Sequence, residues 1–119
     1  MFYKITNGHK LPHDPFKSLI VPRPIGWVSS VSPQNGVNLA PFSFFNAISS
    51  DPPMVVLGIN GTHVEGGDKD TLSNIKQTKD FVVNIATWDL RHRMNQTSAS
   101  LPRTVDEMDV AKLRAKPST

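Results

Sequence analysis

The chain contains no cysteine among its 119 residues. Disulfides, thiolate nucleophiles, iron–sulfur clusters and thiolate zinc sites are therefore excluded together. It also lacks a run of about 20 apolar residues, the length that a membrane-spanning helix requires. The first residues, from Met1 to Lys4, do not show the basic, apolar and small-residue regions of a secretory signal. We therefore expect no membrane segment and a cytoplasmic location.

Motifs for metal binding and for nucleophilic hydrolysis are also missing. The four histidines show no HExxH spacing, and Pro12 disfavours a helix that would pair His9 with His13, so we predict no metal site. There is no Gly-x-Ser-x-Gly elbow. Ser73 and Lys76 match Ser-x-x-Lys, but the other motifs of that enzyme class are absent, which favours an ordinary surface helix.

The charge of the chain is weakly basic, with a formal net charge of +3. Such an excess attracts nucleic acid, an anionic lipid surface or a phosphate-bearing cofactor, and it is too small to choose among them. Aromatic platforms flanked by Lys and Arg are not evident, so nucleic acid is not an expected partner. The length suits one core, and we predict a single domain over residues 1–119.

Turn-forming residues indicate the fold class. Ten prolines and seven glycines fall mostly between apolar runs, which predicts a mainly β fold with short helices. Residues 25–31 alternate in polarity, residues 32–36 have turn chemistry, and residues 37–49 are predicted as the second arm of a hairpin. Asp51-Pro52-Pro53 should then turn the chain, and residues 54–59 are predicted as a strand buried on both faces.

The rest of the chain alternates short helices with one strand. We predict a helix that begins at Asp70, is capped by that residue, and buries Leu72 and Ile75. A strand is predicted over residues 81–86, a second helix over 87–96 and a helical turn over 106–113.

The helix start at residues 69–71 is a candidate anion site. Free backbone N–H groups, the positive end of the helix dipole, the Thr71 hydroxyl and the Lys69 ammonium all favour a phosphate. Asp68 and Asp70 would repel an anion and favour an ordinary capped helix instead. Both interpretations remain open on these residues alone.

Several segments in order resemble one known family, the flavin reductase-like proteins, which are FMN-binding split barrels. The resemblance covers nearly the whole chain and includes the uncommon Asp-Pro-Pro corner; it rests on residues 22–30, 38–47, 49–53, 69–75 and 81–84. It implies a mainly β, Greek-key split barrel with short helices. Because the family's barrel normally continues well beyond the equivalent of Thr119, we expect a barrel that is truncated at its C-terminus.

The resemblance also implies which residues bind the cofactor. Some would form apolar walls for the flavin ring, some would bind its polar edge, and some would offset the phosphate charge. The complete set is Arg23, Trp27, Ser43, Phe44, Asn46, Ala47, Ser49, Ser50, Lys69 and Thr71. The alternative is that Trp27 belongs to the core and that Ser49 and Ser50 only complete a turn.

The function that the resemblance implies is hydride transfer from NAD(P)H to bound FMN, with FAD left open as the flavin. Hydride transfer needs no acid, base or nucleophile from the protein, so we predict no catalytic side chain. Family members usually form homodimers and pass reduced flavin to an oxygenase or another acceptor. The alternative is a flavin-binding or electron-transfer module without turnover, an inactive fragment.

Overall fold

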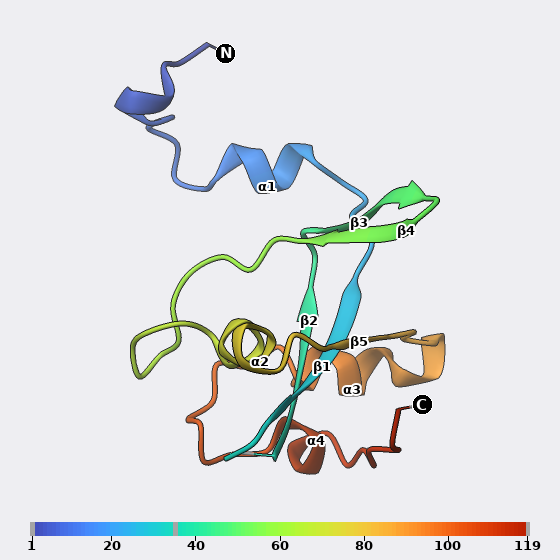
Figure 1. The fold of residues 1–119 in the computed structure, drawn as a ribbon. Coiled ribbons are helices and arrows are strands. Elements are labelled where there is room, and N and C mark those ends of the chain that lie inside the picture. Colours follow the sequence, from blue (N-terminus) through green and yellow to red (C-terminus); the bar gives the residue numbers. More distant parts are fainter. Residues whose placement is uncertain (1, 35, 119) are drawn as a thin grey trace.

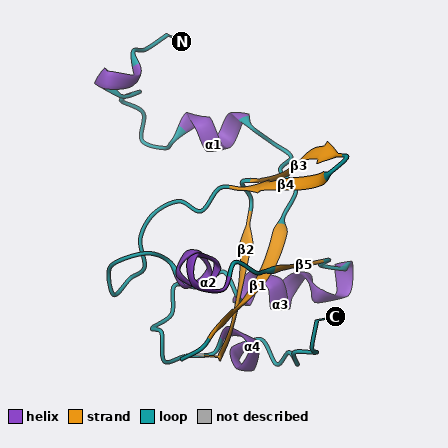
Figure 2. Ribbon diagram, in the orientation of Figure 1, coloured by secondary structure: helices purple, strands orange, loops and turns teal. Residues whose placement is uncertain are grey.

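The computed structural model describes residues 2–34 and 36–118. It consists mainly of short β-strands, with short helices between and around them (Figure 1 and Figure 2). The strands form a three-stranded sheet in the order β2-β1-β5 and a separate two-stranded sheet of β3 and β4. No helix in the described part of the chain is long and apolar enough to cross a membrane.

The central strand of the larger sheet is β1 (Gly26–Ser32), which is paired on both sides. It runs antiparallel to β2 (Gly36–Phe42) over its whole length and to β5 (Val82–Asn84) over three residues. The predicted hairpin at residues 25–37 is therefore confirmed. Asn35, part of its predicted turn, lies outside the described residues. The predicted strand at 81–86 is also confirmed, although only its middle forms β5.

The second arm of that hairpin is shorter than predicted. It does not continue to Ser49, because β2 ends at Phe42 and β3 (Phe45–Ser50) pairs with β4 (Pro53–Leu57) in the other sheet. The two prolines stand where a sheet tolerates them. Pro52 lies in the turn with Asp51, and Pro53 is the first residue of β4, opposite Ser50. The predicted corner is thus a tight hairpin turn.

Two glycines permit the change of direction between the sheets. A Cβ atom on Gly26 would lie 2.7 Å from the Phe45 Cγ atom, and one on Gly58 would lie 2.9 Å from the Phe44 Cβ atom. The Gly58 N–H also donates to the Phe44 carbonyl at 2.7 Å. The bend after β2 therefore depends on close approach of two phenylalanines to bare backbone, which a search for alternating polarity does not detect.

The smaller sheet is more exposed than the sequence predicts. Residues 54–59 were expected to be buried on both faces, but Met54, Val55 and Val56 are all exposed. The reason is that β3 and β4 form a separate two-stranded sheet whose principal packing, among the described residues, is between its own two strands, whereas a strand buried on both faces needs two covering layers.

The principal helix is α2 (Asp70–Thr78), which packs against β1. It begins at Asp70 as predicted, but Lys69 occupies the N-cap, so Asp70 is the first helical residue rather than the cap. Its buried residues are Thr71 and Asn74, whereas Leu72 and Ile75 are only partly buried. The helix therefore meets the sheet with polar side chains, and a prediction based on apolar spacing selects the wrong face.

The two helical segments predicted after β5 are both present. The helix expected over 87–96 is a 3-10 turn, η2 (Trp88–Leu90), followed by α3 (Arg91–Gln96). The expected helical turn is α4 (Glu107–Val110), which Asp106 caps by accepting from the Met108 N–H at 2.7 Å.

The N-terminal segment projects from the body of the molecule (Figure 1). It contains a 3-10 turn, η1 (Ile5–Asn7), and a short helix, α1 (Pro15–Leu19), which the sequence analysis did not predict. Asp14 caps α1 and Pro15 opens it, so the Asp-Pro pair was the signal available. The radius of gyration is 16.1 Å, against about 13.5 Å for a compact chain of this length.

Candidate functional site

Trp27 on β1 belongs to the buried core. Its side chain is 3% exposed, and its indole Nε1–H donates to the Thr97 hydroxyl oxygen at 2.9 Å. Trp27, Leu39 and Phe81 help to line an open cavity of about 960 Å³, which extends to residues 113–118 at the end of the chain. Of the predicted flavin-site residues, Trp27 is the one that lines this cavity, and it is also part of the core, as the alternative interpretation holds.

A second, smaller cavity lies where α2 begins. This cleft has a volume of about 130 Å³, and Lys69 and Thr71 line it together with His63 from the preceding loop. Residues of β2, residues 97–101 after α3, Asp70 and Glu107 also line it. Three residues are predicted to offset the phosphate charge, and the structure brings two of them, Lys69 and Thr71, together at this cleft. The third, Arg23, does not line it and lies beside Phe44 instead.

Thr71 has a structural role at this cleft. Its side chain is 2% exposed, and its hydroxyl oxygen accepts a hydrogen bond from the Asn38 amide at 2.8 Å. One turn further along α2, the Asn74 amide donates to the Ser30 hydroxyl at 3.1 Å. These two bonds attach α2 to β2 and β1, so they fix the position of the first turn of the helix.

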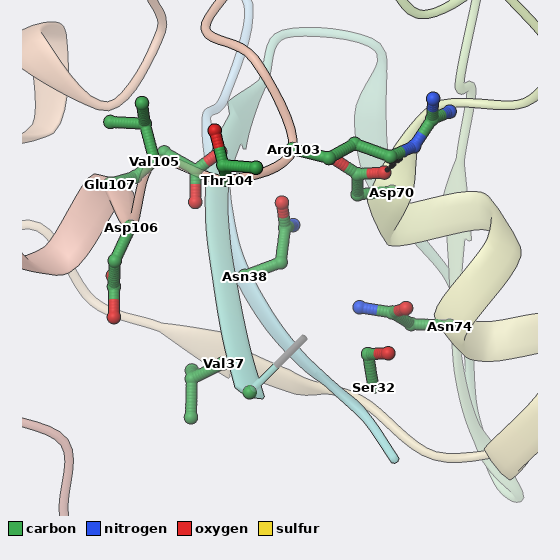
Figure 3. Close-up of a pocket in the computed structure, with 11 residues that line it drawn as sticks. Ser32, Val37, Asn38, Asp70, Asn74, Arg103, Thr104, Val105, Asp106 and Glu107 are labelled. Carbon is green, nitrogen blue, oxygen red and sulfur yellow. Dashed lines mark hydrogen bonds and ion pairs between the residues drawn. The ribbon is translucent and has the colours of Figure 1, made fainter. Parts of the chain in front are cut away.

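A third, polar cavity of about 80 Å³ also has Asp70 in its lining (Figure 3). Asn38 from β2, Asn74 from α2 and Glu107 from α4 line it. Burial raises the pKa of the Glu107 carboxyl above its ordinary value of 4.5; backbone N–H groups of Glu107 and Leu39 oppose this shift, and Asp70 and Asp106 add to it. Glu107 lines the cleft as well, so a carboxyl that resists ionisation stands between the two cavities.

The predicted site residues near the smaller sheet form a separate group. The Arg23 guanidinium lies 5.7 Å from the centre of the Phe44 ring, and its Nη1 donates to the carbonyl oxygens of Lys17 and Ile20. Arg23 therefore holds the end of α1 against the bend after β2. Its Nε is buried with no hydrogen-bond partner among the described residues.

The remaining predicted residues lie along the bend and β3. Ser43 is in the bend, Asn46 and Ala47 are exposed on β3, and Ser49 and Ser50 end that strand. The pairing of β3 with β4 is irregular between Ala47 and Ser49. Such a bulge re-aims side chains and leaves backbone groups unpaired, which suits a ligand-binding edge. The ten predicted residues thus occupy three regions: the core, the cleft, and the bend with β3.

Several polar residues that line the cleft or bond to its lining were not predicted from the sequence. His63, Asn38 and Arg103 are the main ones; Arg103 bonds to Asp70, which is 33 positions away in the sequence. No local pattern links residues so far apart, and a lone arginine in a polar stretch has no distinguishing signal.

The sheet order and the two-sheet arrangement are those of a split β-barrel of mainly β structure with short helices. The chain belongs to the flavin reductase-like family, because that family's model, the flavin reductase like domain, matches residues 18–119. The resemblance noted from the sequence is thereby confirmed.

Related sequences and structures agree with this membership. An uncharacterized protein of Aquifex aeolicus is 39% identical over 100 residues, which are 84% of this chain and 50% of the relative. The uncharacterized protein YwrF of Bacillus subtilis is 43% identical over 82 residues, 69% of this chain and 39% of the relative.

Two crystal structures superpose on the whole of this chain. Component B of nitrilotriacetate monooxygenase from Bacillus cereus is 32% identical with a TM-score of 0.82, and 59% of it is covered. The 2-nitrobenzoate 2-nitroreductase NbaA of Pseudomonas fluorescens is 26% identical with a TM-score of 0.76, and 56% of it is covered. The chain spans about half the length of the relatives it matches.

Proposed function

We propose that this chain binds FMN and takes part in flavin reduction by NAD(P)H. The observation that carries the proposal is the cleft at the start of α2, which is lined by Lys69 and by the first turn of the helix. The chain belongs to the flavin reductase-like family, whose name implies a flavin as the ligand. A bound flavin supplies a ring that accepts hydride.

The residues present fit the two ends of FMN. At the cleft, the helix start has no side-chain cap, so backbone N–H groups of its first turn are available to a phosphate. Along β3, Asn46, Ser49 and Ser50 offer polar groups beside the apolar side chains of Ala47 and Phe44. A flat ring with polar edges needs that combination. FAD, which carries the same ring and a second phosphate, is the alternative flavin.

The proposed role of the protein in hydride transfer is to hold and orient. The reaction needs the nicotinamide against one face of the ring, and it needs no proton-transferring side chain. Because reduced nicotinamide nucleotides are held inside cells, we propose a cytoplasmic location. The Bacillus cereus neighbour is a monooxygenase component, which supports the proposal of an oxygenase as acceptor of the reduced flavin.

A binding module without turnover is the second candidate, and the open cavity beside β1 favours it. That cavity, of about 960 Å³, leaves Ile85 and Val31 at its margin exposed. Chemistry on a reduced flavin benefits from exclusion of water, and this surface of the chain is not closed.

Association of two copies is a further part of the proposal. Phe2, Ile5 and Leu19 in the projecting N-terminal segment are at least 80% exposed, and Ile48 on β3 is 62% exposed. Apolar side chains at this density on one arm and one hairpin favour a partner surface, and we propose a homodimer. Light scattering at several protein concentrations tests it; a monomer at every concentration contradicts it.

The main experiment follows the spectrum of the flavin. FMN is added to the purified chain without oxygen, and visible absorbance and flavin fluorescence are recorded before and after NADH or NADPH. A flavin reductase changes the FMN spectrum on binding and then bleaches it with at least one nucleotide. A binding module gives the first change without the second. No change on adding FMN contradicts both.

A further inference from the structure

Arg103 connects the segment before α4 to the loop before α2. Its Nε donates to the Asp70 Oδ1 atom at 2.9 Å, and its Nη2 donates to the carbonyl oxygens of Gly66 and Asp68 at 3.1 and 3.0 Å. Its backbone N–H donates to the Glu65 Oε2 atom at 3.2 Å. One side chain and its own backbone therefore fix four positions of the loop that carries Lys69.

Ion pairs in this region also compensate the negative charges next to Lys69. Lys69 stands between two carboxylates that would repel an anion. Asp68 is paired with Lys76 at 2.6 Å, and Asp70 is paired with Arg103 at 2.9 Å. Lys69 itself forms no ion pair within residues 2–34 and 36–118. Both carboxylates are thus compensated from elsewhere, and the Lys69 ammonium is available.

Lys76 and Arg103 compensate the charges of Asp68 and Asp70, and the pair formed by Arg103 is the less exposed to water. Asp70 lines the cleft and its side chain is 22% exposed, while Asp68 is 45% exposed and better screened by water. His63 also approaches Asp70, with its Nε2 atom 3.5 Å from Oδ2, but histidine is charged only when protonated. A guanidinium stays charged throughout the working pH range, and its planar fork reaches several acceptors at once.

We propose that Arg103 is a positioning residue that makes the cleft at Lys69 selective for a phosphate monoester. It neutralises Asp70 and holds the loop 65–70, without touching the ligand itself. The inference rests on the proposed binding of FMN, because it concerns the phosphate end of that molecule. It predicts that Arg103 contributes to affinity for FMN and contributes little to affinity for riboflavin, which has the same ring and no phosphate.

The test compares dissociation constants for FMN and riboflavin, measured by flavin fluorescence. The variants are Arg103→Gln, the double variant Arg103→Gln with Asp70→Asn, Arg103→Lys, and Arg93→Gln as a matched control. Arg93→Gln removes the same charge, and the Arg93 side chain donates a hydrogen bond to the Lys112 carbonyl at 3.2 Å, away from the cleft lining. Binding of riboflavin reports that each variant is folded.

Arg103→Gln should weaken FMN binding about tenfold, because the Asp70 carboxylate is left without its cation and repels the phosphate, with riboflavin binding within about twofold of the parent. The double variant should recover the preference for FMN, because Asp70, the carboxylate that lines the cleft, no longer carries a charge, and Arg93→Gln should keep it. An unchanged ratio of the two constants in Arg103→Gln, or no recovery in the double variant, overturns the inference.

If Arg103→Gln binds neither flavin, the Arg103→Lys variant provides the test, because it keeps a cation beside Asp70. A retained preference for FMN in that variant supports the inference, and a lost preference overturns it. Failure of the proposed function looks different, since the parent chain then binds neither flavin.

Discussion

The Asn38 amide on β2 donates to the Thr71 hydroxyl on α2 at 2.8 Å, where the Thr71 side chain is almost fully buried. This bond crosses from the sheet to the first turn of the helix that opens onto the cleft. Its removal therefore affects both the packing of α2 and the alignment of the proposed phosphate site.

Thr71→Val should lower the free energy of unfolding by about 0.5–1.5 kcal/mol, because the part-buried Asn38 amide loses its acceptor while the volume is conserved. Thr71→Ser keeps the hydroxyl and is the matched control, with a smaller loss from the missing methyl group. Urea unfolding of the three proteins checks the prediction. Equal midpoints for Thr71→Val and the parent would contradict it.

The hydrogen bond between Trp27 and Thr97 allows an independent test of the core. Thr97 is 2% exposed and its hydroxyl oxygen accepts the buried indole N–H at 2.9 Å. Thr97→Val leaves that N–H without a partner and should cost about 1–3 kcal/mol of stability. In Trp27→Phe, which has no N–H, the same Thr97→Val change should cost clearly less; additive losses in the double variant would argue against the bond.

The bend between the sheets makes a prediction about Gly26. Gly26→Ala places a Cβ atom 2.7 Å from the Phe45 ring, and overpacking of this kind costs about 1–3 kcal/mol. Because the clash is with one side chain, a second change, Phe45→Ala, should reduce the cost of the alanine. Thermal unfolding of the two single variants and the double variant measures the coupling, and strictly additive shifts would contradict this account of the bend.

What the sequence predicts and what it misses follow from the range of the interactions. Alternation and turn residues predict β1, the start of β2 and the turn at Pro52, because those signals are local. The break at Ser43 depends on Gly26 and Gly58, which approach Phe45 and Phe44 from distant parts of the chain.

The same reasoning explains the candidate site. Lys69 and Thr71 are adjacent to a local signal for a helix start, and the structure brings them to one cleft. The contribution of Arg103 arises from tertiary contacts across 33 to 38 positions. The prediction of which face of α2 is buried is wrong, because Thr71 and Asn74 form hydrogen bonds with residues of the sheet. Polar side chains can be buried when they have such partners.

Lys69 is expected to act on the phosphate of FMN and not on the ring. Lys69→Gln should weaken FMN binding about tenfold, the effect of one charge-assisted hydrogen bond, and leave riboflavin binding within about twofold. Lys79→Gln is the matched control, since Lys79 is exposed at the other end of the same helix. Titration of both flavins by fluorescence checks it; equal weakening of FMN and riboflavin would show that Lys69 supports the fold instead.

Glu107 gives the chain a predicted dependence of stability on pH. Its carboxyl has a pKa raised by burial above 4.5, so the folded state holds a proton that the unfolded state has released. The stabilisation is complete below the unfolded pKa and is lost as pH rises through the folded pKa, because in that interval the native state binds more protons.

Glu107→Gln should therefore gain stability relative to the parent as pH rises from 4.5 through the raised pKa, and the gain should disappear at lower pH, where the parent carboxyl is also neutral. Glutamine keeps an oxygen that can accept from the Leu39 N–H, so the bond to β2 survives the change. Thermal unfolding of both proteins over this interval gives the difference directly, with Asp109→Asn as an exposed control. A difference that is constant with pH would mean that the carboxyl is ionised freely in the folded chain.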